Sequence, residues 1–150
     1  MIASVVLAIT IIAVTMPFAA GAQNQQEEAH RTAANFLAQE LMEETLSRSF
    51  EDGGATNTMG PEAGENSHTE FDSVNDYDGM DEPVGEIVDA AGQVVSDPAA
   101  VGLSRHARVR YLTVGHQQGS ESKFASIEVE IRYNGQSLLK LTRLFYDSSQ

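Results

Sequence analysis

The first 22 residues of the chain carry no charged side chain, and this segment limits the possible folds more than any other feature. They read MIASVVLAITIIAVTMPFAAGA. A helix of this length, at about 1.5 Å per residue, reaches roughly 33 Å, which is enough to cross the apolar core of a bilayer. We therefore expect residues 1–22 to form an apolar helix in a membrane or among partner helices. Proline removes a backbone hydrogen bond, so we expect a kink at Pro17.

Residues 23–50 continue this segment as a polar stretch that favours an amphipathic helix. They contain no Gly or Pro and are rich in Ala, Leu, Glu and Gln, which are strong helix formers. At about 100° per residue, one apolar stripe covers about 140° of arc, the width expected for a helix that lies on a sheet. Gly53-Gly54 is the predicted stop. The stripe is the predicted partner-helix face, and its members are Ala29, Ala33, Phe36, Leu37 and Leu41.

Charge is distributed unevenly along the chain, which has a formal net charge of −13. Residues 1–100 contain 18 acidic and two basic residues, whereas residues 101–150 contain four acidic and seven basic residues. Phosphate binding needs clustered Lys and Arg, so this balance argues against a nucleic-acid partner. The asymmetry suits head-to-tail packing of subunits, and an acidic linker beside an ordinary sheet explains it equally well.

The acidic, Gly-rich stretch 51–82 is predicted to be a long loop that is too hydrophilic to pack. Around Gly79 it places several oxygen ligands of the kind that hard cations require. The spacing does not match an EF-hand, because Val74 stands at the first ligand position and no Glu stands at the twelfth. Calcium binding is therefore a hypothesis beside the simpler solvated turn. Its ligands would be Asp72, Asp76, Asp78 and Asp81.

Residues 83–150 are predicted to form an antiparallel sheet. Residues 105–114 and 124–133 alternate with the period of half-buried strands, and residues 86–88 and 93–95 flank a weak hairpin signal. Asn134-Gly135 is a strong turn signal. Pairing the apolar faces leads us to expect a bulged three-residue loop, Tyr133 to Gly135, which sets Val129 opposite Leu139.

No motif of catalysis occurs in the sequence. Cysteine is absent, which excludes disulfides, thiolate metal sites and a Cys nucleophile. The four histidines are scattered without HExxH spacing, and no Gly-x-Ser-x-Gly, Walker or dinucleotide motif is found. His30, beside Glu27 and Glu28, is expected on the solvated face of a helix. We therefore expect neither an enzyme nor a resident cofactor, and no small-molecule substrate is identified.

The order of elements resembles the type IV pilins and the pseudopilins of type II secretion. In that family an apolar and then amphipathic helix precedes a variable loop and an antiparallel sheet. Met1 to Leu7, MIASVVL, is similar to the stretch that follows the family's motif glutamate, and Pro17 falls where many pilins carry a kinking proline. The family's basic leader, cleavage glycine and glutamate do not occur in this sequence. Either a few residues precede Met1, or the protein is not processed as a pilin.

The resemblance implies an α+β protein with four segments: an apolar helix (1–22), an amphipathic continuation (23–50), a loop (51–82) and a sheet (83–150). It implies a minor pilin-like or pseudopilin-like subunit of a type IV pilus or type II secretion filament, whose partners are other pilin-like subunits. Before assembly the subunit would span the bacterial inner membrane once, with its C-terminal region in the periplasm or on the cell surface. Two alternatives stay open: an exported, soluble β-rich binding protein cleaved after Ala22, and a simple single-span membrane-anchored protein.

Overall fold

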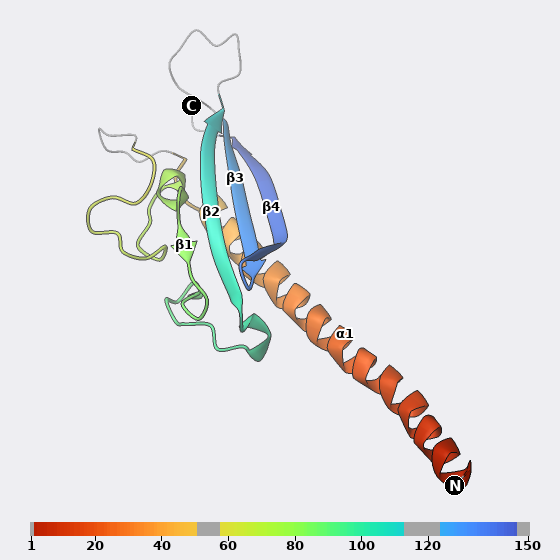
Figure 1. The fold of residues 1–150 in the computed structure, drawn as a ribbon. Coiled ribbons are helices and arrows are strands. Elements are labelled where there is room, and N and C mark those ends of the chain that lie inside the picture. The colour runs from red at the N-terminus through yellow and green to blue at the C-terminus, as the bar shows by residue number, and fades with distance from the viewer. Residues whose placement is uncertain (1, 51–57, 113–123, 147–150) are drawn as a thin grey trace.

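The computed structural model describes residues 2–50, 58–112 and 124–146, with the backbone alone for residues 2–20, 22 and 23. A helix packs on a small antiparallel sheet, which confirms the predicted α+β class (Figure 1). The described strands have the order β1-β2-β3-β4. The elements are α1 (Ile2–Leu46), η1 (Val74–Tyr77), β1 (Asp81–Glu82), η2 (Pro98–Ala100), β2 (Leu103–Leu112), β3 (Phe124–Tyr133) and β4 (Gln136–Tyr146).

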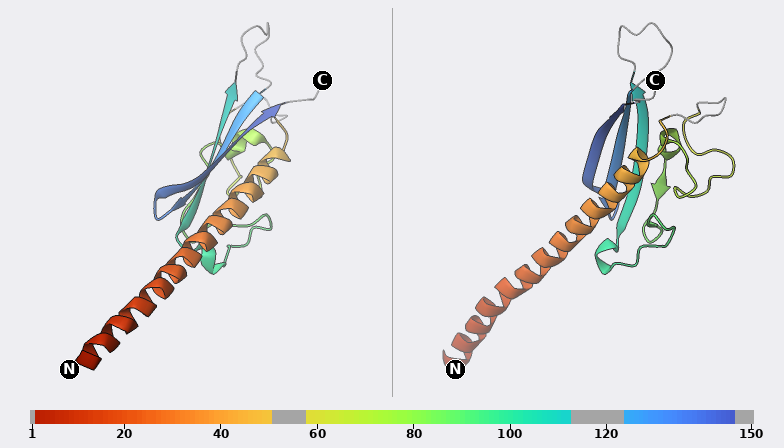
Figure 2. Two further views of the ribbon diagram at one scale, coloured as in Figure 1. Left: turned by 90° about the vertical axis from the view of Figure 1, so that its right-hand side faces the viewer. Right: turned by 180° about the vertical axis from the view of Figure 1, so that it is seen from behind.

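The C-terminal half of α1 lies across one face of the sheet, and its N-terminal half extends beyond the sheet (Figures 1 and 2). Helix α1 continues through Pro17 without interruption, and the predicted kink at this residue stays a prediction. The main core lies between α1 and the sheet, and each fully buried Leu, Ile or Val side chain contributes about 1.5–3 kcal/mol. Its aliphatic members include Leu37, Leu41, Met42, Leu103, Val109, Ile127, Val129 and Ile131.

The helix ends at Leu46, so the predicted extension to residue 50 is wrong. The amide of Ser49 donates to the carbonyl of Asp72, and the amide of Val74 donates to the carbonyl of Ser49. The chain leaves the helix because these backbone groups pair with a distant segment. Gly53 and Gly54, the predicted stop, lie outside the described residues.

Within stretch 51–82, most of residues 68–82 pack against the rest of the protein, which corrects the expectation of a solvated loop for this part, whereas residues 58–67 are mostly exposed. Phe71, Val74, Tyr77 and Met80 are all buried. The rings of Phe71 and Tyr77 meet edge to face, with centroids 5.0 Å apart. A few well-spaced apolar side chains are enough here because the polar groups between them form hydrogen bonds to one another. The stretch also contributes β1, which has no sequence signal.

The alternating pattern predicted two strands well. Strand β3 has the predicted bounds, and β2 begins two residues earlier than expected. These strands are neighbours in the sheet, with Arg108 opposite Glu128. The predicted hairpin of residues 86–88 and 93–95 is reduced to a single bridge between Val88 and Val94, outside the sheet.

The turn between β3 and β4 differs from the predicted three-residue loop. Tyr133 pairs with Gln136, so the loop has two residues, and both Asn134 (φ 49°) and Gly135 (φ 80°) have the positive φ of a type I′ turn. Strand β4 has one extra residue, which is accommodated in a β-bulge opposite the step between Ile131 and Arg132. The bulge restores apolar pairing, because Val129 lies opposite Leu141.

Candidate functional site

The buried face of α1 is turned away from the predicted partner-helix stripe. Leu37 and Leu41 are buried, but Ala29 and Phe36 are exposed and Ala33 is half-buried. The centre of the buried face lies about 100° around the helix axis from the centre of the predicted stripe. It consists of His30, Ala34, Leu37, Ala38, Leu41, Met42 and Thr45.

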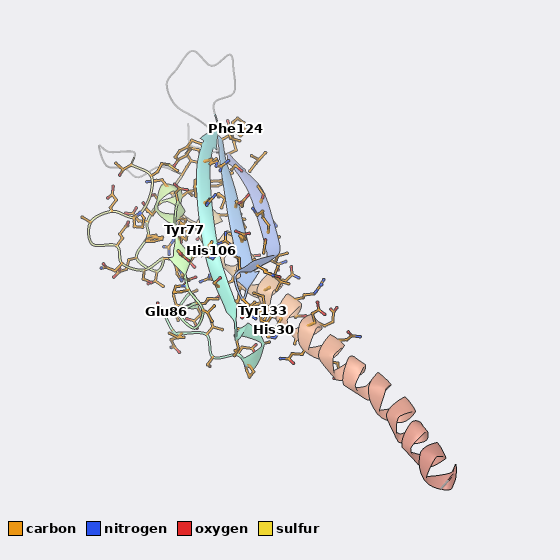
Figure 3. All side chains as sticks on the ribbon, viewed as in Figure 1. His30, Tyr77, Glu86, His106, Phe124 and Tyr133 are labelled. Carbon is orange, nitrogen blue, oxygen red and sulfur yellow. The ribbon has the colours of Figure 1, made fainter. Side chains whose placement is uncertain are left out.

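Two polar residues belong to this buried face because each has a hydrogen-bond partner. His30 donates from Nδ1 to the carbonyl of Ala99 at 2.8 Å, and its ring lies 4.6 Å from that of Tyr133 (Figure 3). The hydroxyl of Thr45 donates to the carbonyl of Leu41. The expectation that His30 is solvated is therefore wrong. Hydrophobic periodicity missed this face because it counts satisfied polar side chains as exposed.

A groove runs along the side of α1 that carries Phe36. It encloses about 840 Å³ between the helix and segment 89–100. Phe36 on the helix and Val94 on the opposite wall are 66% and 58% exposed. Glu40 accepts a hydrogen bond from the amide of Ala90 through Oε1, whereas its Oε2 has no partner among the described residues. The groove thus combines exposed apolar surface with an incompletely paired carboxylate, which suits binding of a partner.

The four predicted calcium ligands do not form one cluster. Asp78 accepts a hydrogen bond from the amide of Val109, and Asp81 pairs with His106 at 2.9 Å. Asp72 and Asp76 lie together with Glu65, with one ligand atom from each within 4.8 Å of the others. Sequence spacing around Gly79 did not identify Glu65 as a neighbour. Calcium binding stays a prediction, now centred on this trio.

The carboxylate of Asp76 is already engaged within the protein. One of its oxygens accepts hydrogen bonds from the amide and the hydroxyl of Ser73, both at 2.8 Å, and from the amide of Asp72. These bonds close the turn at the start of η1 in a capping-box arrangement. The primary role of Asp76 is therefore to hold η1.

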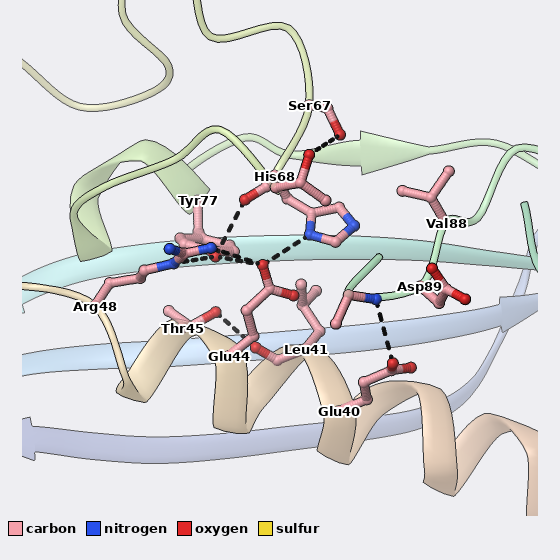
Figure 4. Close-up of polar contacts among 12 residues, drawn as sticks. Glu40, Leu41, Glu44, Thr45, Arg48, Ser67, His68, Tyr77, Val88 and Asp89 are labelled. Atoms are coloured by element: carbon pink, nitrogen blue, oxygen red, sulfur yellow. Dashed lines mark hydrogen bonds and ion pairs between the residues drawn. The ribbon is translucent and has the colours of Figure 1, made fainter. Parts of the chain in front are cut away.

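A buried polar network joins α1 to the packed segment that follows it (Figure 4). Glu44 on α1 receives hydrogen bonds from the Nδ1 of His68 at 3.0 Å, from the hydroxyl of Tyr77 at 3.1 Å and from Arg48 at 3.2 Å. Burial acts to raise the pKa of Glu44, but these bonds and the charge of His68 outweigh it, so the pKa is lowered. Burial raises the pKa of Tyr77, which therefore acts as a neutral donor.

Arg105 on β2 extends the network towards β1. Its side chain is almost wholly buried and forms an ion pair with Glu82, the residue directly opposite on β1. The guanidinium also donates to the backbone carbonyls of Leu37 and Val88 and lies 3.4 Å from Nε2 of His68. One side chain therefore connects the helix, two strands and segment 87–88. We assign a structural role to this network, because every charged group in it is paired within the protein.

Sequence reasoning missed this network altogether. Its partners are far apart in the chain, since His68 follows Glu44 by 24 residues and Arg105 follows Leu37 by 68. No spacing rule for helices or strands reaches such distances. The one available signal was Arg105 at a core-facing position of an alternating strand, where a charged residue requires a buried partner.

The lowered pKa of Glu44 predicts a specific pH dependence of stability. A lowered folded-state pKa stabilises the fold above the ordinary value of 4.5, and this contribution is lost as pH falls through the folded-state pKa. Glu44→Gln is expected to cost about 1–3 kcal/mol at neutral pH and progressively less below pH 4.5.

Urea denaturation of the full chain in nonionic detergent at several pH values measures this difference. Near-UV circular dichroism of tyrosine is a suitable signal because the chain contains no Trp. The exposed neighbour Glu43, changed to Gln, is the control and should have little effect at any pH. A Glu44→Gln cost that stays constant from neutral to acid pH would contradict the assignment.

Among the residues whose side chains are described, no helical segment is both long and apolar enough to span a membrane. Comparison with protein-family models, with curated proteins and with solved structures finds no match to this chain.

Proposed function

We propose that the protein is a pilin-like structural subunit, anchored in a membrane by residues 1–22 until it joins a filament. The observation that carries this proposal is the single helix α1. Its N-terminal half is uncharged up to Ala22, and its C-terminal half packs on the sheet. A helix of this kind joins an apolar assembly segment directly to a folded domain.

The surface of the folded part agrees with a role in assembly. The groove beside Phe36 offers apolar contact surface, and in the polar network Oε1 of Glu44 already accepts hydrogen bonds from His68 and Tyr77 within the protein. Neither arrangement provides a nucleophile next to a base, the usual signature of covalent catalysis. Binding between subunits is the function that these features support best.

Fractionation of bacterial cells that express the full chain tests the proposal. The protein should sediment with membranes, resist a high-salt wash and dissolve in nonionic detergent. A variant with Ile11→Lys and Val14→Lys should move to the soluble fraction, because each Lys near the centre of a span costs about 2.5–3.5 kcal/mol. The matched control, Gln25→Lys with Gln26→Lys, adds the same charge to the polar part of α1 and should stay with the membranes.

Intact mass and N-terminal sequencing of the recovered protein separate the rival functions. A mature protein that begins at Gln23 and is soluble would contradict the filament subunit and support the exported binding protein. A protein that keeps residues 1–22 but does not sediment with membranes would also contradict the proposal.

A further inference from the structure

The two flanks of α1 present opposite kinds of surface. The groove and segment 89–100 lie on the β1 side of the helix, and β4 lies on the other side (Figures 1 and 2). Three acidic residues line the groove, namely Glu40, Asp89 and Asp97, and no basic residue does. On the other flank β4 carries Lys140 and Arg143 and no acidic residue.

Strand β4 is an edge strand of the described sheet, with one side not paired to another strand. Such edges form contacts with other chains unless they are blocked. The exposed side chains near the end of β4 include Arg143 and Leu144, and Leu144 is 69% exposed. Lys140 is bound to Glu128, whereas Arg143 has no charged or hydrogen-bonding partner among the described residues.

The groove and this edge are complementary in detail. On the groove side, Oε2 of Glu40 is buried and has no partner among the described residues, and Phe36 and Val94 are exposed apolar groups on opposite walls. Adjacent side chains of a strand point in opposite directions. A strand edge inserted into the groove therefore presents Arg143 and Leu144 to opposite walls, and in one of the two orientations Arg143 lies next to Glu40 and Leu144 against the wall that carries Val94.

We propose that the groove binds the β4 edge of a second copy of this chain, with Arg143 of one copy paired to Glu40 of the next. Because the groove and the edge are different surfaces, the contact is heterologous and repeats from copy to copy, as a filament requires. The inference rests on the proposed function in taking a second copy as the partner. It goes beyond that function because it places a contact between subunits on the folded part of the chain, outside residues 1–22.

The absence of cysteine allows a direct cross-linking test. Full-length Val94→Cys and Leu144→Cys proteins, one carrying a size tag, are mixed in nonionic detergent, which covers the apolar segment, and oxidised. A mixed disulfide dimer is expected. The control mixture replaces Leu144→Cys by Arg110→Cys, another exposed position, on the outer sheet face of β2. Equal cross-linking in both mixtures, or dimers formed mainly between two Val94→Cys copies, would overturn the proposal.

A charge exchange tests the pairing itself. Arg143→Glu should raise the Kd of self-association about tenfold, measured by sedimentation velocity in the same detergent. Arg31→Glu makes the same change in net charge at an exposed position outside the groove and should leave the Kd unchanged. Combining Arg143→Glu with Glu40→Arg should restore association. An Arg143→Glu protein that associates like Arg31→Glu would overturn the proposal.

The membrane test and the association test fail independently. If the chain fractionates with membranes but the detergent-solubilised protein does not cross-link, only the proposed groove contact is contradicted. A chain that is soluble in cells but still forms the Val94–Leu144 cross-link supports the contact and contradicts the membrane-anchored subunit.

Discussion

Replacement of Arg105 by methionine is expected to lower the free energy of unfolding by about 3–5 kcal/mol, because it leaves the buried Glu82 carboxylate without its cation. The ion pair lies in the interior, and the same guanidinium also satisfies the carbonyls of Leu37 and Val88. Loss of the side chain therefore also removes hydrogen bonds to α1 and to segment 87–88. Methionine keeps much of the volume, so a cavity contributes little.

Urea denaturation in nonionic detergent, followed by the near-UV signal of tyrosine, measures this loss. Arg108→Met on the same strand is the control, because that side chain is exposed and should change stability by less than about 0.5 kcal/mol. Adding Glu82→Met to Arg105→Met should recover part of the loss, since no unpaired charge then stays buried. Equal, small effects of the Arg105 and Arg108 changes would show that the network contributes little to the fold.

The sheet was the most predictable part of the protein. The alternation in residues 124–133 is strict, and a period of two leaves one face for the core, so β3 was located correctly. The turn was harder. Pairing of apolar faces was the right condition, but a three-residue loop and a two-residue loop followed by a bulge both satisfy it. The structure has the second arrangement, in which Asn134 and Gly135 form the tight turn that they favour.

The packed stretch after α1 was mispredicted because its stability depends on long-range contacts. Composition shows many acidic and small residues there, and composition is all that a loop prediction uses. Tyr77 and His68 are buried because α1 supplies Glu44 as their partner, which no local pattern reveals. The groove was missed for a related reason, since one of its walls comes from segment 89–100.

The corrected orientation of α1 leads to the second large expected effect. Leu41→Ala should cost about 2–5 kcal/mol, because this side chain is wholly buried between α1 and the sheet and its removal leaves a cavity. Phe36→Ala, which removes a larger side chain from the same helix, should change stability by less than about 0.5 kcal/mol, since Phe36 is mostly exposed in the groove. The predicted stripe placed both residues on one face, so the pair distinguishes the two orientations in a single denaturation series. Comparable losses of stability for the two variants would show that Phe36 belongs to the core and not to the groove. The expected contrast, a stable Phe36→Ala protein with weakened self-association, would separate the folding face of α1 from its binding face.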